Sequence, residues 1–371
     1  MKRTEGFVDS VPLNRCNTQR SAMKITVLGA GAVGSMIGGL LQADAPEFEV
    51  TLVGRGEHGN AIQKHKALVV EDGKSSREIA IKCTSDVSAA AGSQILLLTV
   101  KSQDTEAMMR SVKPYLGDAI LVSIQNGMND GVLSTYVPID RLVMGVTATN
   151  VYVAEPGRVS LQLGGATVFG PPRNGRLGAA VKYATDVCDR IRSESLRFLA
   201  TADLVAMQYH KLTINAVGYA SCLSASNFIS DALCHGPWRT VVGLPLLREC
   251  QRLVESAHVR MQRIPGTPSL RGLSYLLHGM NAPVVGSLLS YAADQLYNRK
   301  PIEFSLLQDL RHRKHTEVNY INGEFVRLGE SLREKAPLNR VVASMANELE
   351  ERGDGSYFTR DEVIRRFQSL N

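Results

Sequence analysis

The 371-residue sequence lacks the features that mark several protein classes. No apolar run approaches the roughly 18–20 residues that a membrane-spanning helix needs. The six cysteines form no C-x-x-C pair and no zinc-type spacing, and six are too few for a disulfide framework in a chain this long. They stand at Cys16, Cys83, Cys188, Cys222, Cys234 and Cys250. We therefore expect reduced thiols, no metal site and no membrane partner.

A strong charge of one sign is also missing. The formal net charge is +6, and five basic against two acidic residues in the stretch 1–24 account for half of it. The remaining body carries only +3, which is too weak for a nucleic-acid surface but suits a cleft for anionic small molecules. We expect a small-molecule substrate and no nucleic-acid partner.

The first residues lack the apolar core of a secretory signal. We expect 1–22 to be a disordered leader in front of the first strand, and a second interpretation takes Met23 as the true start. The basic residues of this stretch leave a mitochondrial presequence as an alternative to the cytoplasmic location that we expect.

Short β-branched runs alternate with helical segments in the first half of the chain. Strands are predicted at 24–28, 49–53, 94–100, 119–123 and 142–148, and helices at 35–42 and 104–113. Residues 67–70 and 78–82 are expected to form a hairpin, and 158–163 and 166–170 an antiparallel pair around Gly164-Gly165. This alternation predicts an α/β domain with a mostly parallel sheet.

Strand signals vanish near residue 200. Helices are predicted at 202–225, 239–258, 301–310, 316–328 and 339–352, whereas prolines and glycines interrupt 264–299. We therefore divide the chain into the leader 1–22, a dinucleotide-binding domain 23–202 and an all-helical domain 203–371. A homodimer formed through the helical domain is compatible with the sequence.

A glycine-rich motif, Gly29-Ala-Gly-Ala-Val-Gly34, joins the first strand to the first helix. Gly29 permits the tight turn, Gly31 lets the backbone approach a pyrophosphate, and Gly34 lets the helix pack closely on the sheet. The helix N-terminus offers unpaired N–H groups to the phosphates. The motif predicts a Rossmann-type site made of Gly29, Ala30, Gly31, Ala32, Val33 and Gly34.

Arg55 follows the second strand, where an enzyme that reads the free ribose of NAD usually carries an acid. The planar guanidinium of an arginine can pair with a 2′-phosphate. We therefore expect NADPH as the cofactor, with NADH as the alternative because Glu57 stands two residues on.

Polar residues follow two further strands. Lys101 comes directly after a predicted strand and Asn126 shortly after the next, and ligands in open α/β sheets bind beyond such strand ends. Lys211 and Asn215 stand four residues apart on a predicted helix and so share one face. Lys101 also has a local interpretation as an ion-pair partner of Asp104 or Glu106, and Asn126 as a turn residue before glycine.

These motifs, followed by the segment 304–323, resemble the ketopantoate reductase family over 23–323. The resemblance implies NADPH-dependent reduction of 2-dehydropantoate to (R)-pantoate, a step toward coenzyme A. It implies that Lys211 protonates the substrate's carbonyl oxygen and that Glu317 orients the substrate. Asn215 and Ser305 would contact the substrate, and Lys101 and Asn126 would line the nicotinamide side of the cleft.

The sequence departs from the family pattern where the substrate would bind. Tyr219 and Ile302 stand where the family usually carries asparagine, and Phe304-Ser305 replaces a pair of serines. A reductase of a larger or more apolar 2-oxo acid, of the D-2-hydroxyacid dehydrogenase type, is therefore the alternative function. A third hypothesis is an NADPH-binding protein without turnover, in which Lys211 and Glu317 would have no purpose.

The shared site also requires a break in the chain. On one straight helix Ser305 and Glu317 would lie about 18 Å apart, too far to share a small substrate. We therefore predict a break around 311–315, with Thr316 capping a new helix.

Overall fold

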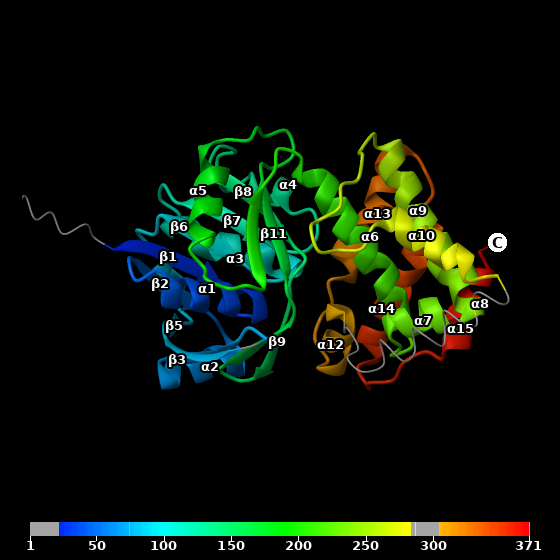
Figure 1. Ribbon diagram of the computed structural model, residues 1–371, viewed down its shortest axis with the longest axis horizontal. Coiled ribbons are helices and arrows are strands. Elements are labelled where there is room, and N and C mark those ends of the chain that lie inside the picture. The colour runs from blue at the N-terminus through cyan, green and yellow to red at the C-terminus, as the bar shows by residue number, and fades with distance from the viewer. Residues whose placement is uncertain (1–21, 74, 283–285, 287–303, 371) are drawn as a thin grey trace, which may run out of the picture.

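The computed structural model describes residues 22–73, 75–282, 286 and 304–370. Two domains lie side by side, an α/β domain and a helical domain, and α6 (Leu204–Cys222) begins where they meet (Figure 1). Apart from Ala22, the expected leader lies outside the described residues, as does Ile302. The predicted architecture, a Rossmann-type domain followed by helices, is confirmed.

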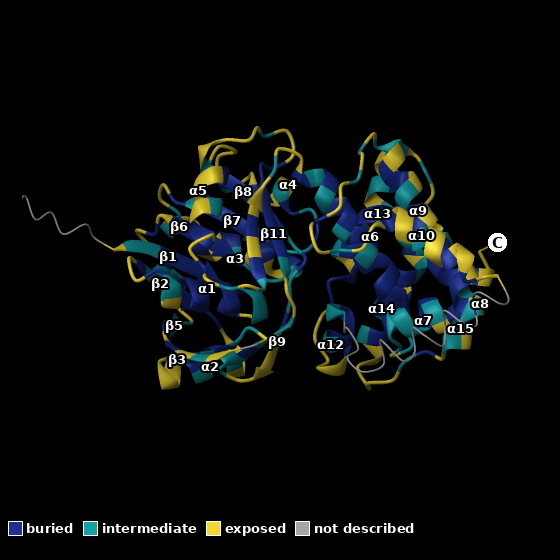
Figure 2. Ribbon diagram, viewed as in Figure 1, coloured by how far each residue is buried: buried dark blue, intermediate teal, exposed yellow. Residues whose placement is uncertain are grey.

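The main sheet has eight strands in the order β12-β11-β8-β7-β6-β1-β2-β5. Its strands pair in parallel except for β8 with β11. They are β1 (Met23–Leu28), β2 (Phe48–Val53), β5 (Lys82–Thr84), β6 (Ile95–Leu98), β7 (Ile120–Ile124), β8 (Leu142–Thr147), β11 (Gly165–Gly170) and β12 (Leu196–Ala200). The apolar run of β6 is buried on both faces because helices cover the sheet, as parallel sheets require (Figure 2).

Helices and short turns connect these strands. They are α1 (Ala32–Asp44), α2 (Gly56–His65), α3 (Thr105–Val112), α4 (Asp130–Leu133) and α5 (Ala179–Cys188), with 3₁₀ turns at Val87–Ala90, Ser102–Asp104 and Lys113–Tyr115. The five predicted strands of the parallel sheet and the helices at 35–42 and 104–113 are confirmed with shifted ends. The strands β5 and β12 were not predicted, because they are short or mixed in polarity.

A second sheet of four strands has the order β4-β3-β10-β9. It consists of β3 (Ala67–Glu71), β4 (Ser76–Ala80), β9 (Asn150–Glu155) and β10 (Arg158–Leu163). The predicted hairpin of β3 and β4 is confirmed by the pairing of Ala67 with Ala80.

The predicted pairing of 158–163 with 166–170 is wrong. β10 pairs with β9 and β3, whereas β11 lies between β8 and β12 in the main sheet. Gly164 and Gly165 carry the chain from one sheet to the other, where a Cβ on Gly164 would lie 2.6 Å from the carbonyl oxygen of Ser195. The glycines therefore mark a close backbone approach, and the hairpin turn is the earlier one at Gly157, whose φ is 85°.

The helical domain is built around α6. The surrounding helices are α7 (Phe228–Cys234), α8 (Gly236–Trp238), α9 (Leu244–Ser256), α10 (Leu270–Gly279), α12 (Ser305–Arg311), α13 (Val318–Leu332), α14 (Pro337–Arg352) and α15 (Arg360–Gln368), with a π turn at Arg239–Gly243. Asp203 caps α6, since its carboxylate accepts the N–H of Ala206. Most of α6 is buried, as expected of a helix in the centre of a domain (Figure 2).

The predicted helices of this domain are confirmed within a few residues, although the start of the one at 301–310 lies outside the described residues. The predicted break is also confirmed, because α12 ends at Arg311 and α13 begins at Val318. Arg313 takes a left-handed φ of 53° between them. The predicted cap is one residue off: Glu317 is the N-cap residue, although the Thr316 hydroxyl accepts the N–H of Val318.

No helix in the described part of the chain is long and apolar enough to cross a membrane. The cysteines within these residues form no disulfide with one another. The same residues contain no cluster of three or more side chains suited to hold a metal ion.

Candidate active site

The glycine-rich turn after β1 has the shape that a dinucleotide needs. Gly29 has a φ of 114°, and a Cβ there would lie 2.7 Å from the backbone nitrogen of Val100. A Cβ on Gly34 would lie 2.2 Å from the Gly29 carbonyl oxygen, so only glycine lets α1 approach the turn so closely. Gly31 differs, because a Cβ there would meet nothing within 4 Å. The space in front of Gly31 is therefore open to a ligand.

The N-terminus of α1 is open as well. Gly31 is the N-cap residue and no side chain caps the helix, whose first turn carries no acid. The turn includes Ala32 and Val33, so their backbone N–H groups point toward the open space. Uncapped N–H groups together with the helix dipole bind phosphate well, so the residues present fit a pyrophosphate.

Arg55 lies at the edge of the same turn. It is exposed and forms the N-cap of α2, directly after the end of β2. A Cβ on neighbouring Gly54 would lie 2.5 Å from the Cβ of Ala30, which shows how closely the two loops approach. Glu57 is also exposed and lies in the first turn of α2. Arg55 and Glu57 therefore both lie at the start of α2, on the loop that packs against the glycine-rich turn.

Lys101 links the two domains. Its ammonium forms an ion pair with Asp309 of α12, and not with Asp104 or Glu106 as the local interpretation would have it. Glu106 pairs with Arg110 instead. Asp309 is buried, which raises the pKa of its carboxyl, while the positive charge of Lys101 opposes that rise. The pair fixes α12 against the carboxyl end of β6.

Glu317 also joins the helical domain to the strand ends. Its carboxylate is 4% exposed; one oxygen accepts the N–H of Ser102 at 3.1 Å and the other accepts the Asn126 amide at 3.0 Å. Gly127 takes a left-handed φ of 84°, as the interpretation of this segment as a turn requires. The Asn126 side chain, however, also binds Glu317. Two predicted site residues from different domains, Glu317 and Asn126, are thus in direct contact.

Lys211 lies on α6 at the wall of a cleft between the domains. Among the described residues it has no hydrogen-bond or ion-pair partner for its ammonium. Burial in these surroundings lowers the pKa of Lys211 to about 8. A lysine with such a pKa can hold a proton at neutral pH and release it to a developing alkoxide.

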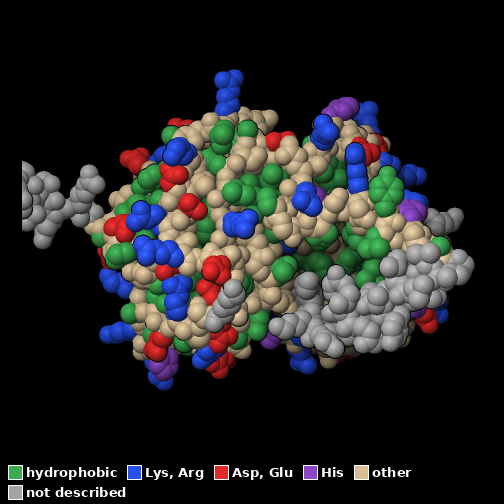
Figure 3. All heavy atoms as spheres, viewed as in Figure 1, with side chains coloured by type: hydrophobic (Ala, Val, Ile, Leu, Met, Phe, Trp, Pro, Cys, Tyr) green, Lys and Arg blue, Asp and Glu red, His purple; other side chains and the backbone are tan. Residues whose placement is uncertain are grey.

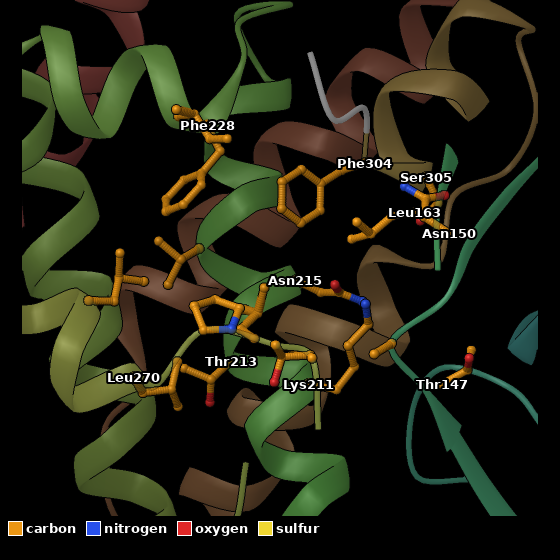
Figure 4. Close-up of a pocket in the computed structure, with 18 of the residues that line it drawn as sticks. Thr147, Asn150, Leu163, Lys211, Thr213, Asn215, Phe228, Leu270, Phe304 and Ser305 are labelled. Carbon is orange, nitrogen blue, oxygen red and sulfur yellow. The ribbon is translucent and has the colours of Figure 1, made fainter. Parts of the chain in front are cut away.

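The cleft has a volume of about 430 Å³, and Val33 of the glycine-rich turn, Asn126 and Lys211 all line it. Asn215, one turn after Lys211, faces the same space (Figure 4). Hydrophobic side chains gather in the hollow between the domains (Figure 3). They include Phe228, Leu247, Leu270, Leu273 and Phe304.

Ser305 lines the cleft as well, and its hydroxyl is 2.8 Å from the hydroxyl of Tyr219. Tyr219 is fully buried, and its ring meets the Phe304 ring edge-on with centroids 6.4 Å apart. The aromatic residues that depart from the family pattern therefore pack together beside the predicted substrate contact. The Phe304 ring also lies against Gly218, where a Cβ would come within 2.3 Å of it.

The structure thus brings Val33, Asn126, Lys211, Asn215 and Ser305 to one cleft. Glu317 contacts Asn126 of that cleft, and Lys101 contacts Asp309 of α12, the helix that begins at Ser305. Arg55, the N-cap residue of α2, is not among the described residues that line this cleft. Sequence reasoning missed Ser102 and Asp309. The only signal for Ser102 was its place after Lys101, and Asp309 stood unremarked within the segment 304–323.

The comparisons with known proteins agree with this architecture. Two sequence models of one family match the chain: "Ketopantoate reductase PanE/ApbA" over residues 25–174 and its C-terminal counterpart over residues 203–350. The chain belongs to the ketopantoate reductase family. The resemblance seen in the sequence motifs is therefore confirmed.

Relatives extend the match to most of the chain. A 2-dehydropantoate 2-reductase of Pyrococcus horikoshii is 26% identical over 90% of this chain and 100% of its own length. The enzyme of that name from Archaeoglobus fulgidus is 27% identical over 88% of this chain and 98% of its own length.

Solved structures share the fold. A PanE/ApbA family ketopantoate reductase from Ralstonia eutropha has a TM-score of 0.69 at 24% identity, covering 89% of this chain and 99% of its own. D-mandelate dehydrogenase with NADH and anilino(oxo)acetate has a TM-score of 0.71 at 18% identity, covering 90% and 100%. The family is one of oxidoreductases, so this chain is an oxidoreductase that uses a nicotinamide dinucleotide and a small-molecule substrate.

Proposed function

We propose that the protein reduces 2-dehydropantoate to (R)-pantoate with NADPH. The observation that carries the proposal is the position of Lys211, whose pKa is lowered to about 8, in the cleft that Val33 of the glycine-rich turn also lines. The proposed proton donor and the proposed dinucleotide site would thus face the same space. Residues 23–202 would bind the cofactor, and 203–371 would supply the acid.

The reaction needs a hydride at C2 of the substrate and a proton at its carbonyl oxygen. The bound nicotinamide supplies the hydride. As the hydride arrives, negative charge grows on the carbonyl oxygen, and the Lys211 ammonium stabilises that charge and gives up its proton. The products are the 2-hydroxy acid, the oxidised cofactor and a neutral Lys211, which regains a proton from solvent.

The remaining residues bind and orient. Asn215 and Ser305 would donate hydrogen bonds to the substrate from the wall that also holds Lys211. Glu317 would orient the substrate, and its contact with Asn126 keeps its carboxylate at the edge of the nicotinamide side. Lys101 would line that same side, held by Asp309.

The cofactor would bind at the glycine-rich turn. The open space at Gly31 and the uncapped α1 fit the pyrophosphate. Arg55 would pair with the 2′-phosphate through its guanidinium, which is why we favour NADPH over NADH. The carboxylate of Glu57 would repel an anion at this position, so the ratio of the Kd values for NADPH and NADH tests the preference.

A second candidate function is the reduction of a larger, more apolar 2-oxo acid. Aromatic and aliphatic side chains, among them Phe228, Leu247 and Phe304, form much of the cleft wall. The apolar part of the cleft would fit an aryl or branched alkyl group.

The test is the rate of NADPH consumption by the purified protein with 2-dehydropantoate and with phenyl- and branched-alkyl-substituted 2-oxo acids. Each substrate is measured with NADPH and with NADH. We expect the highest kcat/KM with 2-dehydropantoate and NADPH. A higher kcat/KM for an aryl 2-oxo acid would favour the second candidate, and turnover of none of them would refute both.

A further inference from the structure

Tyr219 has a buried hydroxyl with one partner among the described residues. The residue lies two turns after Lys211 on α6 and is 0% exposed. Its hydroxyl is 2.8 Å from Ser305 Oγ, and among the described residues it makes no other hydrogen bond. Ser305, the first residue of α12, likewise has no other side-chain hydrogen bond within those residues, and it lines the cleft.

The two hydroxyls carry one hydrogen each, so the direction of the bond can be worked out. Burial raises the pKa of Tyr219 well above its usual value, and the negative charge of Glu317 raises it further, so the phenol stays protonated. If Ser305 were the donor, the phenol hydrogen would be left buried without an acceptor among the described residues, which is costly. Tyr219 is therefore the donor and Ser305 Oγ the acceptor.

That direction fixes what Ser305 offers to the cleft. The serine oxygen is occupied by the phenol hydrogen, and no other described residue engages the serine's own hydrogen, which can therefore turn toward the cleft. A hydroxyl that accepts one hydrogen bond becomes a stronger donor in the next. The arrangement therefore presents a polarised donor, which suits an anionic oxygen of the substrate better than a neutral one.

We propose that Tyr219 is a positioning residue that donates to Ser305 Oγ and so aims the Ser305 hydroxyl hydrogen at the carboxylate of the bound 2-oxo acid. The proposal rests on the proposed function, because it takes a 2-oxo acid as the ligand of the cleft. In the family pattern an asparagine at this position would offer its own amide. Here the tyrosine acts through the serine, 86 residues further along the chain.

The test is a double-mutant cycle with Tyr219→Phe, Ser305→Ala and the double variant. KM and kcat are measured for 2-dehydropantoate at saturating NADPH. Tyr219→Phe keeps the ring and removes only the hydroxyl, so we expect KM to rise roughly fivefold to tenfold, kcat to change less than about twofold, and the KM for NADPH to stay unchanged. The KM of the double variant should be no higher than that of Ser305→Ala, because both substitutions interrupt the same chain of hydrogen bonds.

Two controls separate positioning from loss of structure. Tyr209→Phe removes another buried hydroxyl of α6, one whose partner is Glu324, and should leave KM unchanged. The primary amide of the same 2-oxo acid should show a smaller rise in KM in Tyr219→Phe than the acid does, since its oxygen carries no full charge.

An unchanged KM in Tyr219→Phe would overturn the proposal on Tyr219 while leaving the proposed function intact. Additive effects of Tyr219→Phe and Ser305→Ala, or equal effects on acid and amide, would overturn it as well. A wild-type protein that turns over no 2-oxo acid would instead refute the proposed function, and the role of Tyr219 with it.

Discussion

The lowered pKa of Lys211 makes a quantitative prediction for the pH dependence of the reaction. The general acid must be protonated, so kcat/KM for reduction should fall as pH rises through about 8. With that pKa, about nine tenths of the lysines are protonated at pH 7 and about one tenth at pH 9. A lysine with the ordinary pKa near 10.5 would remain about 97% protonated at pH 9.

The neighbours of Lys211 do not obscure this titration. Burial lowers the pKa of adjacent His210 to about 4 and raises that of Tyr209 to about 12. Neither group therefore titrates between pH 6 and pH 10. A loss of activity in this range would thus report on Lys211 rather than on the imidazole or phenol beside it.

The assay is the initial rate of NADPH consumption at low 2-oxo acid concentration, measured from pH 6 to about pH 10. Oxidation of the 2-hydroxy acid needs the neutral amine, so its rate should rise over the same range. Lys211→Arg serves as the control, because its guanidinium stays charged and the residual activity should lose the fall near pH 8. A wild-type profile that stays flat to about pH 10 would refute the assignment of Lys211 as the acid.

Three further predictions follow from the same geometry. Gly31→Ala should fold normally but bind NADPH roughly tenfold more weakly, whereas Gly34→Ala should lower the melting temperature, because its Cβ would lie 2.2 Å from the Gly29 carbonyl oxygen. Equal melting temperatures for the two variants would contradict this prediction. Arg55→Ala should raise the Kd for NADPH about tenfold or more without changing that for NADH, as titration calorimetry would show. Lys211→Met should abolish turnover. It should also raise the free energy of unfolding at pH 7, measured in urea, by about 1–3 kcal/mol, because it removes a charge that burial disfavours. A variant less stable than the wild-type protein would contradict this prediction.

Part of this fold could be predicted from local patterns. The run Ile95–Leu98 and the glycine-rich turn indicate a buried strand and its helix without any knowledge of distant residues. The break near Arg313 could be predicted because two residues on one straight helix would lie too far apart to share a substrate. Local reasoning failed at Gly164-Gly165, since a glycine pair that carries the chain between sheets looks the same in sequence as a hairpin turn.

The contacts of the site were harder to predict. Ser102 binds Glu317 through its backbone N–H, and every residue except proline has that group. The pair formed by Tyr219 and Ser305 joins residues from two helices, so only the fold reveals it. Sequence reasoning thus identified several side chains that line one cleft, whereas their partners depended on how the two domains pack.

The most direct test of the account is the kcat of Lys211→Ala with 2-dehydropantoate and saturating NADPH, compared with that of the wild-type protein. Removing a general acid that acts at the transition state should lower kcat about 10²-fold to 10⁴-fold, while NADPH binding, followed by fluorescence, stays within about twofold. A kcat within a few fold of the wild-type value would contradict the central claim that Lys211 protonates the substrate.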